Sequence, residues 1–228
     1  MKRPADIRAP PRDWLRVLKA SYPFLRQKGI GDLVLFGSQA MSAYMKTPLR
    51  SKDLDLVSSQ IGPKHHNALQ EHLAQTEDIQ VRSSTIQTKP LHHGEMKIYT
   101  VELRVSGRPF FVEILDKVLD GKPPSIIAPH VQTIRKWKLD LWVPSPSTVV
   151  AIRLAFRPPE GITRLNCIRL NAFIKHQRKR LDYKLIGRIA NQWGAGPVVE
   201  ANLDQLHKRH RLKVLHEAEI LSSISRKE

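Results

Sequence analysis

One stretch, residues 33–57, constrains this chain more than any other. An apolar run stops abruptly at Gly37 and Ser38, and a short helix is expected to follow. After a basic turn, a second apolar run carries two aspartates one residue apart, Asp53 and Asp55. Because side chains alternate between the two faces of a strand, both carboxylates are expected on the same face.

Two carboxylates on one strand face repel each other, and burying them without partners is costly. A divalent cation removes both problems, and Mg²⁺ takes a few carboxylates together with substrate phosphates. Glu113 poses the same problem within a later apolar strand, residues 109–116. If that strand neighbours the first, three carboxylates converge and can hold two metal ions roughly 3.5–4 Å apart. The alternative is that Arg or Lys side chains pair with the aspartates.

A phosphate-binding element is expected just upstream of the aspartates. Glycine between a strand and a helix lets the backbone approach a phosphate, and helix amides with the Ser38 hydroxyl can then bind a triphosphate. The pattern is not a Walker loop, because no Gly-Lys-Ser/Thr follows. Arg50 and Lys52 flank the aspartates and can neutralise phosphate charge, or they are simply exposed turn residues.

The rest of the chain divides into a mixed first part and a helical second part. A helix is expected after Pro10-Pro11, and residues 79–116 alternate with period two around a turn at Ser106-Gly107. Residues 117–144 are rich in Pro, Gly and Lys and are interpreted as a boundary region, which predicts domains 1–125 and 126–228. Later helices are expected at about 147–156, 163–177, 182–193 and 199–223.

The formal net charge of +17 favours a polyanionic partner, and nucleic acid comes first. A single cysteine, Cys167, excludes an internal disulfide and a cysteine-based zinc cluster, which fits a reducing compartment. The N-terminus lacks the apolar core of a signal peptide, and no apolar run approaches the ~18 residues of a membrane span. A cytoplasmic protein without a membrane partner is therefore expected.

The order strand, Gly-Ser, helix, basic turn, Lys-Asp-Leu-Asp-Leu and a later strand with a third acid resembles the nucleotidyltransferase superfamily, which has the DNA polymerase β-like fold. The resemblance covers about residues 25–120. It implies an α+β fold, with a mixed sheet and flanking helices followed by an α-helical C-terminal half. It assigns an NTP triphosphate to Gly37 and Ser38. It assigns two Mg²⁺ ions, or Mn²⁺ in their place, to three carboxylates: Asp53, Asp55 and Glu113.

Asp116 is the less favoured third acid, because it lies on the opposite strand face from Glu113. Within the superfamily, the order of parts is most similar to the AbiEii/MenT-like nucleotidyltransferase toxins of type IV toxin–antitoxin systems. Those proteins carry a lysine on a helix after a Ser-Pro-type cap, where this chain has Arg153, and an aspartate further on, for which Asp182 is the candidate. Arginine keeps the charge but changes the geometry, and Asp182 can equally be a helix cap.

The resemblance implies an enzyme that moves a nucleoside monophosphate from an NTP to an acceptor. With the charge, it favours RNA, and tRNA first, as that acceptor. It also implies a toxin of a toxin–antitoxin or phage-defence system, with a cognate antitoxin as a further partner. Two alternatives stay open: transfer to a protein or small-molecule hydroxyl, and a catalytically inactive nucleic-acid-binding relative.

Two tandem histidine pairs, His65-His66 and His92-His93, lie in expected loops or at a helix start and show no metal-ligand spacing. They are predicted to be surface residues. Cys167 lies in an apolar helical pattern and is predicted to be buried and inert.

Overall fold

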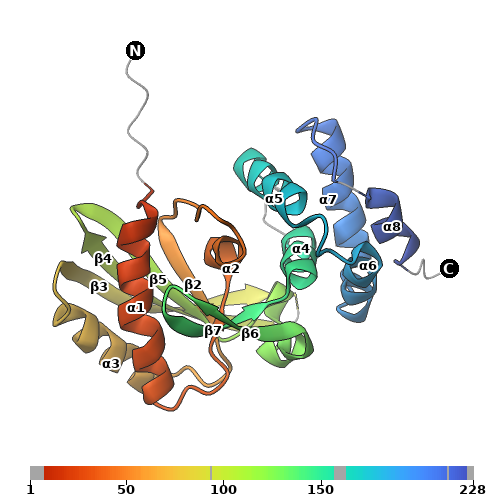
Figure 1. Ribbon diagram of the computed structural model, residues 1–228. Helices are drawn as coiled ribbons and strands as arrows, with labels where there is room; N and C mark the ends of the chain where they lie inside the picture. Colours follow the sequence, from red (N-terminus) through yellow and green to blue (C-terminus); the bar gives the residue numbers. More distant parts are fainter. Residues whose placement is uncertain (1–7, 93, 157–162, 215, 225–228) are drawn as a thin grey trace. The chain divides into compact units, whose positions relative to one another are not determined.

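The computed structural model describes residues 8–92, 94–156, 163–214 and 216–224 (Figure 1). The chain forms two compact units, the first from Met1–Ser125 and Gln132–Val143 and the second from Ile126–Val131 and Pro144–Glu228. The domains expected from the sequence, 1–125 and 126–228, stay a prediction, and residues 132–143 belong to the first unit of the structure.

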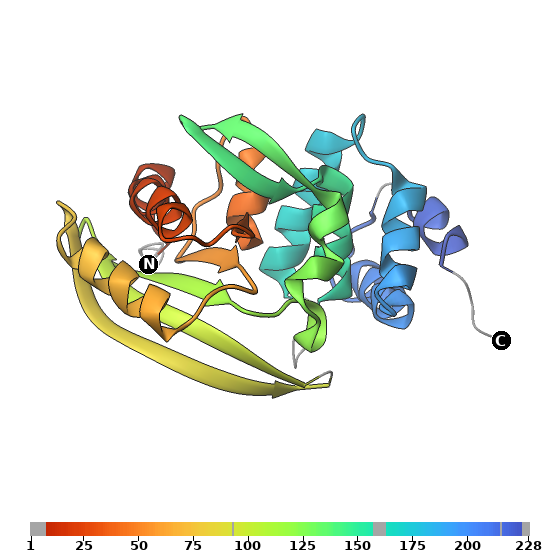
Figure 2. The ribbon, with the colours of Figure 1, turned by 90° about the horizontal axis from the view of Figure 1, so that it is seen from below.

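The first unit is built on a five-stranded mixed sheet with the order β1-β2-β5-β4-β3. The central pair, β2 and β5, is parallel, and the other neighbours are antiparallel. β3 and β4 form the long curved hairpin that dominates Figure 2. The strands are β1 (Val34–Leu35), β2 (Asp53–Val57), β3 (Ile79–Leu91), β4 (Gly94–Val105) and β5 (Arg108–Leu115).

One face of this sheet carries the core of the unit. Leu54 and Leu56 of β2 pair with Val112 and Ile114 of β5, and all four side chains are fully buried. Helices α1 (Pro11–Gln27) and α3 (Pro63–Ala74) lie along the sheet on the same side (Figure 2). Period-two alternation therefore puts Asp53, Asp55 and Glu113 on the other face of β2 and β5, together with apolar residues of β5 such as Phe111.

A second, two-stranded sheet occupies part of the region that was interpreted as a boundary. β6 (Val131–Lys136) and β7 (Leu139–Pro144) pair with each other, after three short 3₁₀ turns. The Tyr22 hydroxyl accepts the Trp142 backbone N–H at 2.9 Å and donates to the Leu33 carbonyl at 2.9 Å. Trp137 packs edge-on against Trp14, with ring centroids 5.2 Å apart. The region 117–144, in which the sequence placed a domain boundary, therefore also contains a small sheet that the sequence did not predict.

The second unit is helical among its described residues, as expected. Its helices are α4 (Pro146–Ala155), α5 (Arg164–Gln177), α6 (Tyr183–Gln192), α7 (Gly196–Lys208) and α8 (Glu217–Ser222). The single helix predicted at 199–223 was wrong, because the chain breaks between α7 and α8, where Arg211 and His216 have positive φ. No helix in the described part of the chain is long and apolar enough to cross a membrane.

One histidine of the tandem pairs, His66, differs from its predicted surface role. His66 is 1% exposed in α3, and its Nε2 lies 3.1 Å from the Thr100 carbonyl oxygen of β4. His66 is therefore a packing residue of the core, and its predicted surface role was wrong. His92 is exposed as predicted, whereas His93 lies outside the described residues. Cys167 is buried, and burial raises the pKa of its thiol to about 11, which agrees with an inert side chain.

Candidate active site

Three carboxylates converge where β2 runs parallel to β5. The register pairs Asp55 with Glu113, as expected if the two apolar strands are neighbours. Asp53 lies one pleat further along the same face, and one ligand oxygen from each of the three groups lies within 4.8 Å of the other two. All three side chains are partly exposed, so solvent and ligands can reach them. Asp116 is elsewhere, accepting the Lys97 backbone N–H at 2.8 Å.

Gly37 fits against this cluster in a way that no other residue can. Its φ is +61°, and a Cβ added there would lie 1.7 Å from Asp55 Oδ2. The backbone N–H of Phe36 donates to the Asp55 carbonyl at 2.9 Å, which holds the strand end against β2. Gly37 therefore serves two needs at once: a left-handed backbone at the start of α2 (Gly37–Ala43) and room for a carboxylate.

A short chain of hydroxyls orients Asp53. The Ser51 hydroxyl donates to Asp53 Oδ1 at 2.8 Å, and the Ser38 and Ser51 hydroxyl oxygens are 2.9 Å apart. The Gln39 side chain also donates to the Asp53 backbone carbonyl. Ser38 is only 5% exposed, so its hydroxyl supports the carboxylate from within the protein. Sequence reasoning found Ser38 but missed Ser51 and Gln39, because their contacts depend on how the turn before β2 folds back onto α2.

Glu113 is the carboxylate with the clearest electrostatic signature. Partial burial raises the pKa of Glu113, and the neighbouring Asp53 raises it further. The ammonium groups of Lys89 and Lys52 lower this pKa and partly offset both effects. The structure therefore brings Lys52, which was predicted, and Lys89, which was missed, within electrostatic reach of the carboxylates. Lys89 lies on the edge strand β3, and its distance from Glu113 depends on the register between β3 and β4. The residues around Lys89 are mostly polar and exposed, so the sequence does not indicate this register.

The remaining candidates lie further out or in the second unit. Arg50 is an exposed turn residue. Arg153 is in the last turn of α4 and is partly exposed. Asp182 caps α6: its Oδ1 accepts the Leu185 backbone N–H at 2.8 Å, and Oδ2 lies 3.5 Å from Arg188. Asp182 thus has the capping role that the sequence left open, and the nucleotide-binding roles of Arg153 and Asp182 stay predictions.

The residues present fit a hard divalent cation. In the described part of the chain, this is the only group of three or more His, Cys, Asp or Glu side chains that could share an ion. It offers carboxylate oxygens alone, which suit Mg²⁺ and Mn²⁺. Glu113 adds a partly buried carboxyl next to a second one, an arrangement that a bound cation stabilises.

Comparisons with known proteins give a likeness of fold. No family model and no curated protein matches the sequence. Among solved structures, JHP933 from Helicobacter pylori is similar, with 11% identity, a TM-score of 0.52, and coverage of 89% of this chain and 95% of that one. The antibiotic-resistance factor ANT(2'')-Ia has 11% identity and a TM-score of 0.50, covering 87% of this chain and 100% of its own.

A nucleotidyltransferase-like protein from Paracoccidioides brasiliensis has 13% identity, a TM-score of 0.49, and coverage of 95% of each chain. The likeness to JHP933 and ANT(2'')-Ia, at identities this low, speaks for the fold and not for a substrate. The predicted fold class is confirmed: a mixed sheet with flanking helices, of the nucleotidyltransferase type, with a helical C-terminal half.

Proposed function

We propose that this protein is a metal-dependent nucleotidyltransferase that moves a nucleoside monophosphate from an NTP to a hydroxyl of RNA, with tRNA as the favoured acceptor. One observation carries the proposal. Asp53, Asp55 and Glu113 place their oxygens within 4.8 Å of one another on one face of paired strands, and Gly37 leaves room for the Asp55 carboxylate. An acid cluster of this kind is costly without a cation, which supports a metal site.

The three carboxylates would hold Mg²⁺ or Mn²⁺, which when bound neutralises phosphate charge and aligns the attacking and leaving oxygens. The chain's own groups supply the rest. Gly37 and Ser38 hold the triphosphate, and Lys52 and Arg50 offset its charge. We also assign Arg153 and Asp182, in the second unit, to nucleotide binding.

Glu113, a carboxylate of the cluster, takes the proton of the acceptor hydroxyl as general base. The hydroxyl oxygen then bonds to the α-phosphorus. The bond from that phosphorus to the oxygen shared with the β-phosphate breaks, and pyrophosphate leaves. Positioning and electrostatic stabilisation supply most of the acceleration in such a reaction.

RNA is favoured as acceptor because the charge of +17 is spread along the whole chain. Residues 1–143 carry a net +8 and residues 144–228 a net +9. A small neutral acceptor would give no reason for such an excess. A role as the toxin of a toxin–antitoxin pair, with a protein antitoxin, rests on the family resemblance in the sequence.

The test is transfer of label from each of the four α-labelled NTPs to total RNA, with Mg²⁺ present and with EDTA. We expect labelled RNA with one or more NTPs, lost with EDTA and lowered at least 10²-fold in Asp53→Asn. Asp116→Asn removes a nearby carboxylate outside the cluster and should keep the activity. Absence of label in any product with all four NTPs would overturn the proposal, and label in a protein or small molecule instead of RNA would overturn the choice of acceptor.

A further inference from the structure

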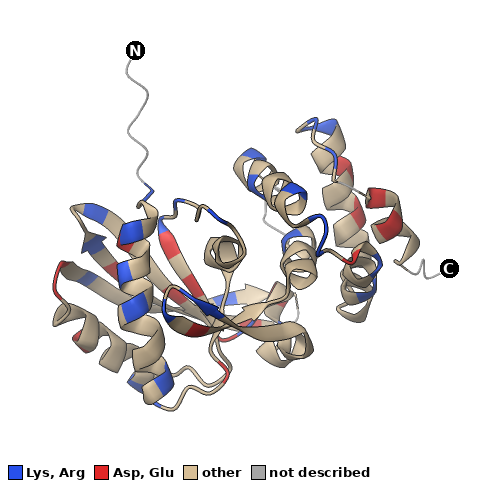
Figure 3. Cartoon of the chain, viewed as in Figure 1, with Lys and Arg blue, Asp and Glu red and all other residues tan. Residues whose placement is uncertain are grey.

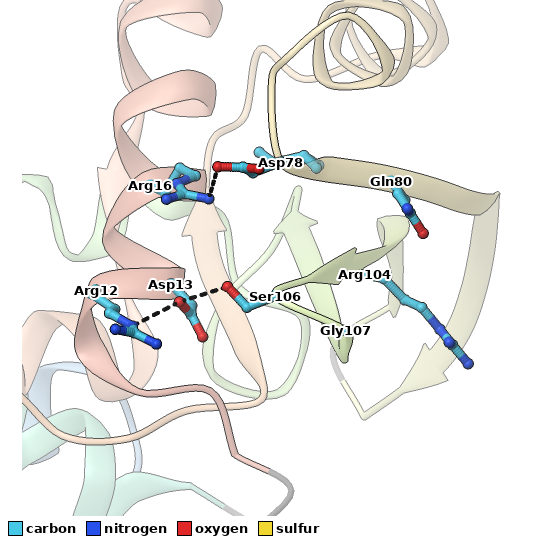
Figure 4. A pocket seen from close by; sticks show the side chains of 9 residues that line it. Arg12, Asp13, Arg16, Asp78, Gln80, Arg104, Ser106 and Gly107 are labelled. Carbon is cyan, nitrogen blue, oxygen red and sulfur yellow. Dashed lines mark hydrogen bonds and ion pairs between the residues drawn. The ribbon is translucent and has the colours of Figure 1, made fainter.

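A second polar site lies in the first unit, away from the carboxylates. It is a pocket of about 560 Å³ between the first turns of α1, the start of β3 and the turn that joins β4 to β5 (Figure 4). Arg108 starts β5 beside this turn, and Glu113 lies five residues further along the same strand. At about 3.3 Å per residue, the pocket is roughly 17 Å from the carboxylates along β5.

Arginines dominate the lining of this pocket. Arg12, Arg16 and Arg104 line it directly, and Arg108 adjoins them through Asp13, 3.8 Å away. The lining acids are Asp13 and Asp78, so the three lining arginines, with Arg108 beside them, outnumber the carboxylates. Arg16 pairs with Asp78 at 2.6 Å, whereas no carboxylate in the described part of the chain pairs with Arg104.

Asp13 holds the wall of the pocket in place but pairs only weakly with the neighbouring arginines. Its side chain is 2% exposed, and its Oδ1 accepts the Ser106 hydroxyl at 3.0 Å, which fastens the β4–β5 turn to α1. Its Oδ2 has no hydrogen-bond partner, and its ion pairs with Arg12 and Arg108 are long, at 3.5 and 3.8 Å. Arg12 and Arg108 therefore keep N–H groups that can donate to a ligand.

The positive charge continues from the pocket along α1. Arg12, Arg16 and Lys19 recur at helical spacing and are all exposed, and Figure 3 shows the blue bands along one side of α1. A spacing of three or four residues separates the cations by about 4.5–6 Å along the helix axis. Such a row suits a chain of phosphates better than a single anion. Arginine in particular matches phosphate oxygens with its planar fork of donors.

We propose that this arginine pocket, together with the row on α1, binds the phosphate backbone of the RNA acceptor. The inference rests on the proposed function for the identity of the ligand, and it names a contact surface away from the metal cluster. At the rise of about 3.4 Å per nucleotide of a helical strand, the separation of roughly 17 Å corresponds to about five nucleotides. An acceptor that uses both sites is therefore a polymer, and trimming it below that length removes the second contact.

The test measures binding of fluorescent tRNA by anisotropy, with NTP absent, across a series of salt concentrations. The variant is Arg12→Gln with Arg104→Gln. Arg104 has no described ion pair, and after Arg12→Gln the buried Asp13 keeps the Ser106 hydroxyl and the guanidinium of Arg108. The control is Arg135→Gln with Lys138→Gln, which removes the same charge from exposed positions around the β6–β7 turn. Thermal unfolding of both variants checks that the fold is kept.

We expect the pocket variant to weaken tRNA binding about tenfold at low salt and to lower the slope of log affinity against log salt by about 1.4. The control variant should change the tRNA affinity and the salt slope only slightly. Equal losses in the two variants would show diffuse charge attraction and overturn the pocket. Binding of vesicles with anionic lipid, lost in the pocket variant while tRNA binding persists, would reassign the surface to lipid and overturn the inference.

The outcome also separates this inference from the proposed function. If the pocket variant and its control bind tRNA equally while the wild-type protein labels RNA, the pocket fails and the enzyme stands. If the pocket variant alone loses tRNA binding and no NTP is ever consumed, the enzyme fails and the binding surface stands.

Discussion

At the scale of single residues, Gly37 connects the proposed phosphate-binding start of α2 with the carboxylate cluster. Its Cα lies against the Asp55 carboxylate, and its backbone is left-handed. We expect Gly37→Ala to lower nucleotidyl transfer at least 10²-fold, because the methyl group displaces Asp55 from the cluster. The measurement is label transfer at saturating NTP, with metal affinity followed by calorimetry.

Gly29→Ala is the matched control for this change. Gly29 also has a positive φ, +93°, but a Cβ there would meet nothing within 4 Å. The strained backbone should cost both variants about 1 kcal/mol of stability, and Gly37→Ala should lose more because its Cβ collides with Asp55. Only Gly37→Ala should lose activity, and a fully active Gly37→Ala would show that Asp55 is not part of the reaction.

Glu113 gives a prediction about pH, because burial and Asp53 raise its pKa in the folded state. A folded carboxyl with a raised pKa binds its proton more tightly than the unfolded one. Stability is therefore lost as pH rises from the ordinary glutamate pKa, ~4.3, through the folded pKa. In EDTA at pH 7.5, Glu113→Gln should raise the melting temperature by a few degrees while abolishing transfer.

The gain in Glu113→Gln should shrink as the pH approaches 4, where the wild-type carboxyl also becomes protonated in both states. Glu95→Gln, an exposed carboxylate on β4, serves as control and should leave the melting temperature unchanged. A lower melting temperature for Glu113→Gln at pH 7.5 would contradict the electrostatic account of the cluster.

Residues whose roles follow from the alternation of side chains along a strand were predictable from the sequence. Residues whose roles depend on how a turn folds or how strands pair were not. Asp53 and Asp55 share a face by period two alone, and Glu113 was conspicuous as a charge in the middle of its apolar run. Ser51 reaches Asp53 through the conformation of a turn, and Lys89 influences Glu113 across two strand pairings. Neither arrangement leaves a local trace in the sequence.

At the scale of secondary-structure elements, the errors share one cause: turns built from residues that are not turn formers. The β6–β7 hairpin turns at Trp137 and Lys138, with φ of +54° and +68°, where a sequence is normally expected to show Asn-Gly. The break after α7 likewise uses Arg211 and His216, at +52° and +55°. Neither position has glycine or proline, so the sequence carried no signal for the β6–β7 turn or for the break after α7. Strands with ordinary turns, such as β4 and β5 around Ser106-Gly107, were predicted correctly.

The unusual β6–β7 turn predicts a stabilising substitution. Lys138→Gly removes the steric cost of a left-handed backbone and should raise the free energy of unfolding by about 0.5–1 kcal/mol, measured by urea denaturation. Trp137 should stay unchanged in this experiment, because its ring packs on Trp14. Thr133→Gly, at an exposed position inside β6, is the control and should destabilise by about the same amount. A loss of stability in Lys138→Gly would mean that the lysine side chain makes a favourable contact that outweighs the strain.

At the scale of the whole molecule, the positive charge is divided almost evenly between the two parts of the chain, +8 in residues 1–143 and +9 in residues 144–228. If residues 144–228 alone bound RNA, the positive charge of residues 1–143, about half of the total, would have no role. Exposed cations in the second unit gather after α5, at Arg178, Lys179 and Arg180. We therefore expect both units to contribute phosphate contacts, each visible in the salt dependence of binding.

The corresponding experiment compares the wild-type protein with Arg178→Gln, Lys179→Gln and Arg180→Gln combined, by tRNA anisotropy between low and moderate salt. If the three cations each contact a phosphate, the slope of log affinity against log salt should fall by about 2, because each contact releases about 0.7 of a counterion from a single strand. The three side chains are exposed, so unfolding should shift little beyond the small loss of charge at a helix C-terminus. Combining these changes with Arg12→Gln and Arg104→Gln should give additive losses in slope if one tRNA spans both units. If the combined variant loses no more than either set alone, the two units do not hold the same RNA at once, and the acceptor contacts belong to one unit only.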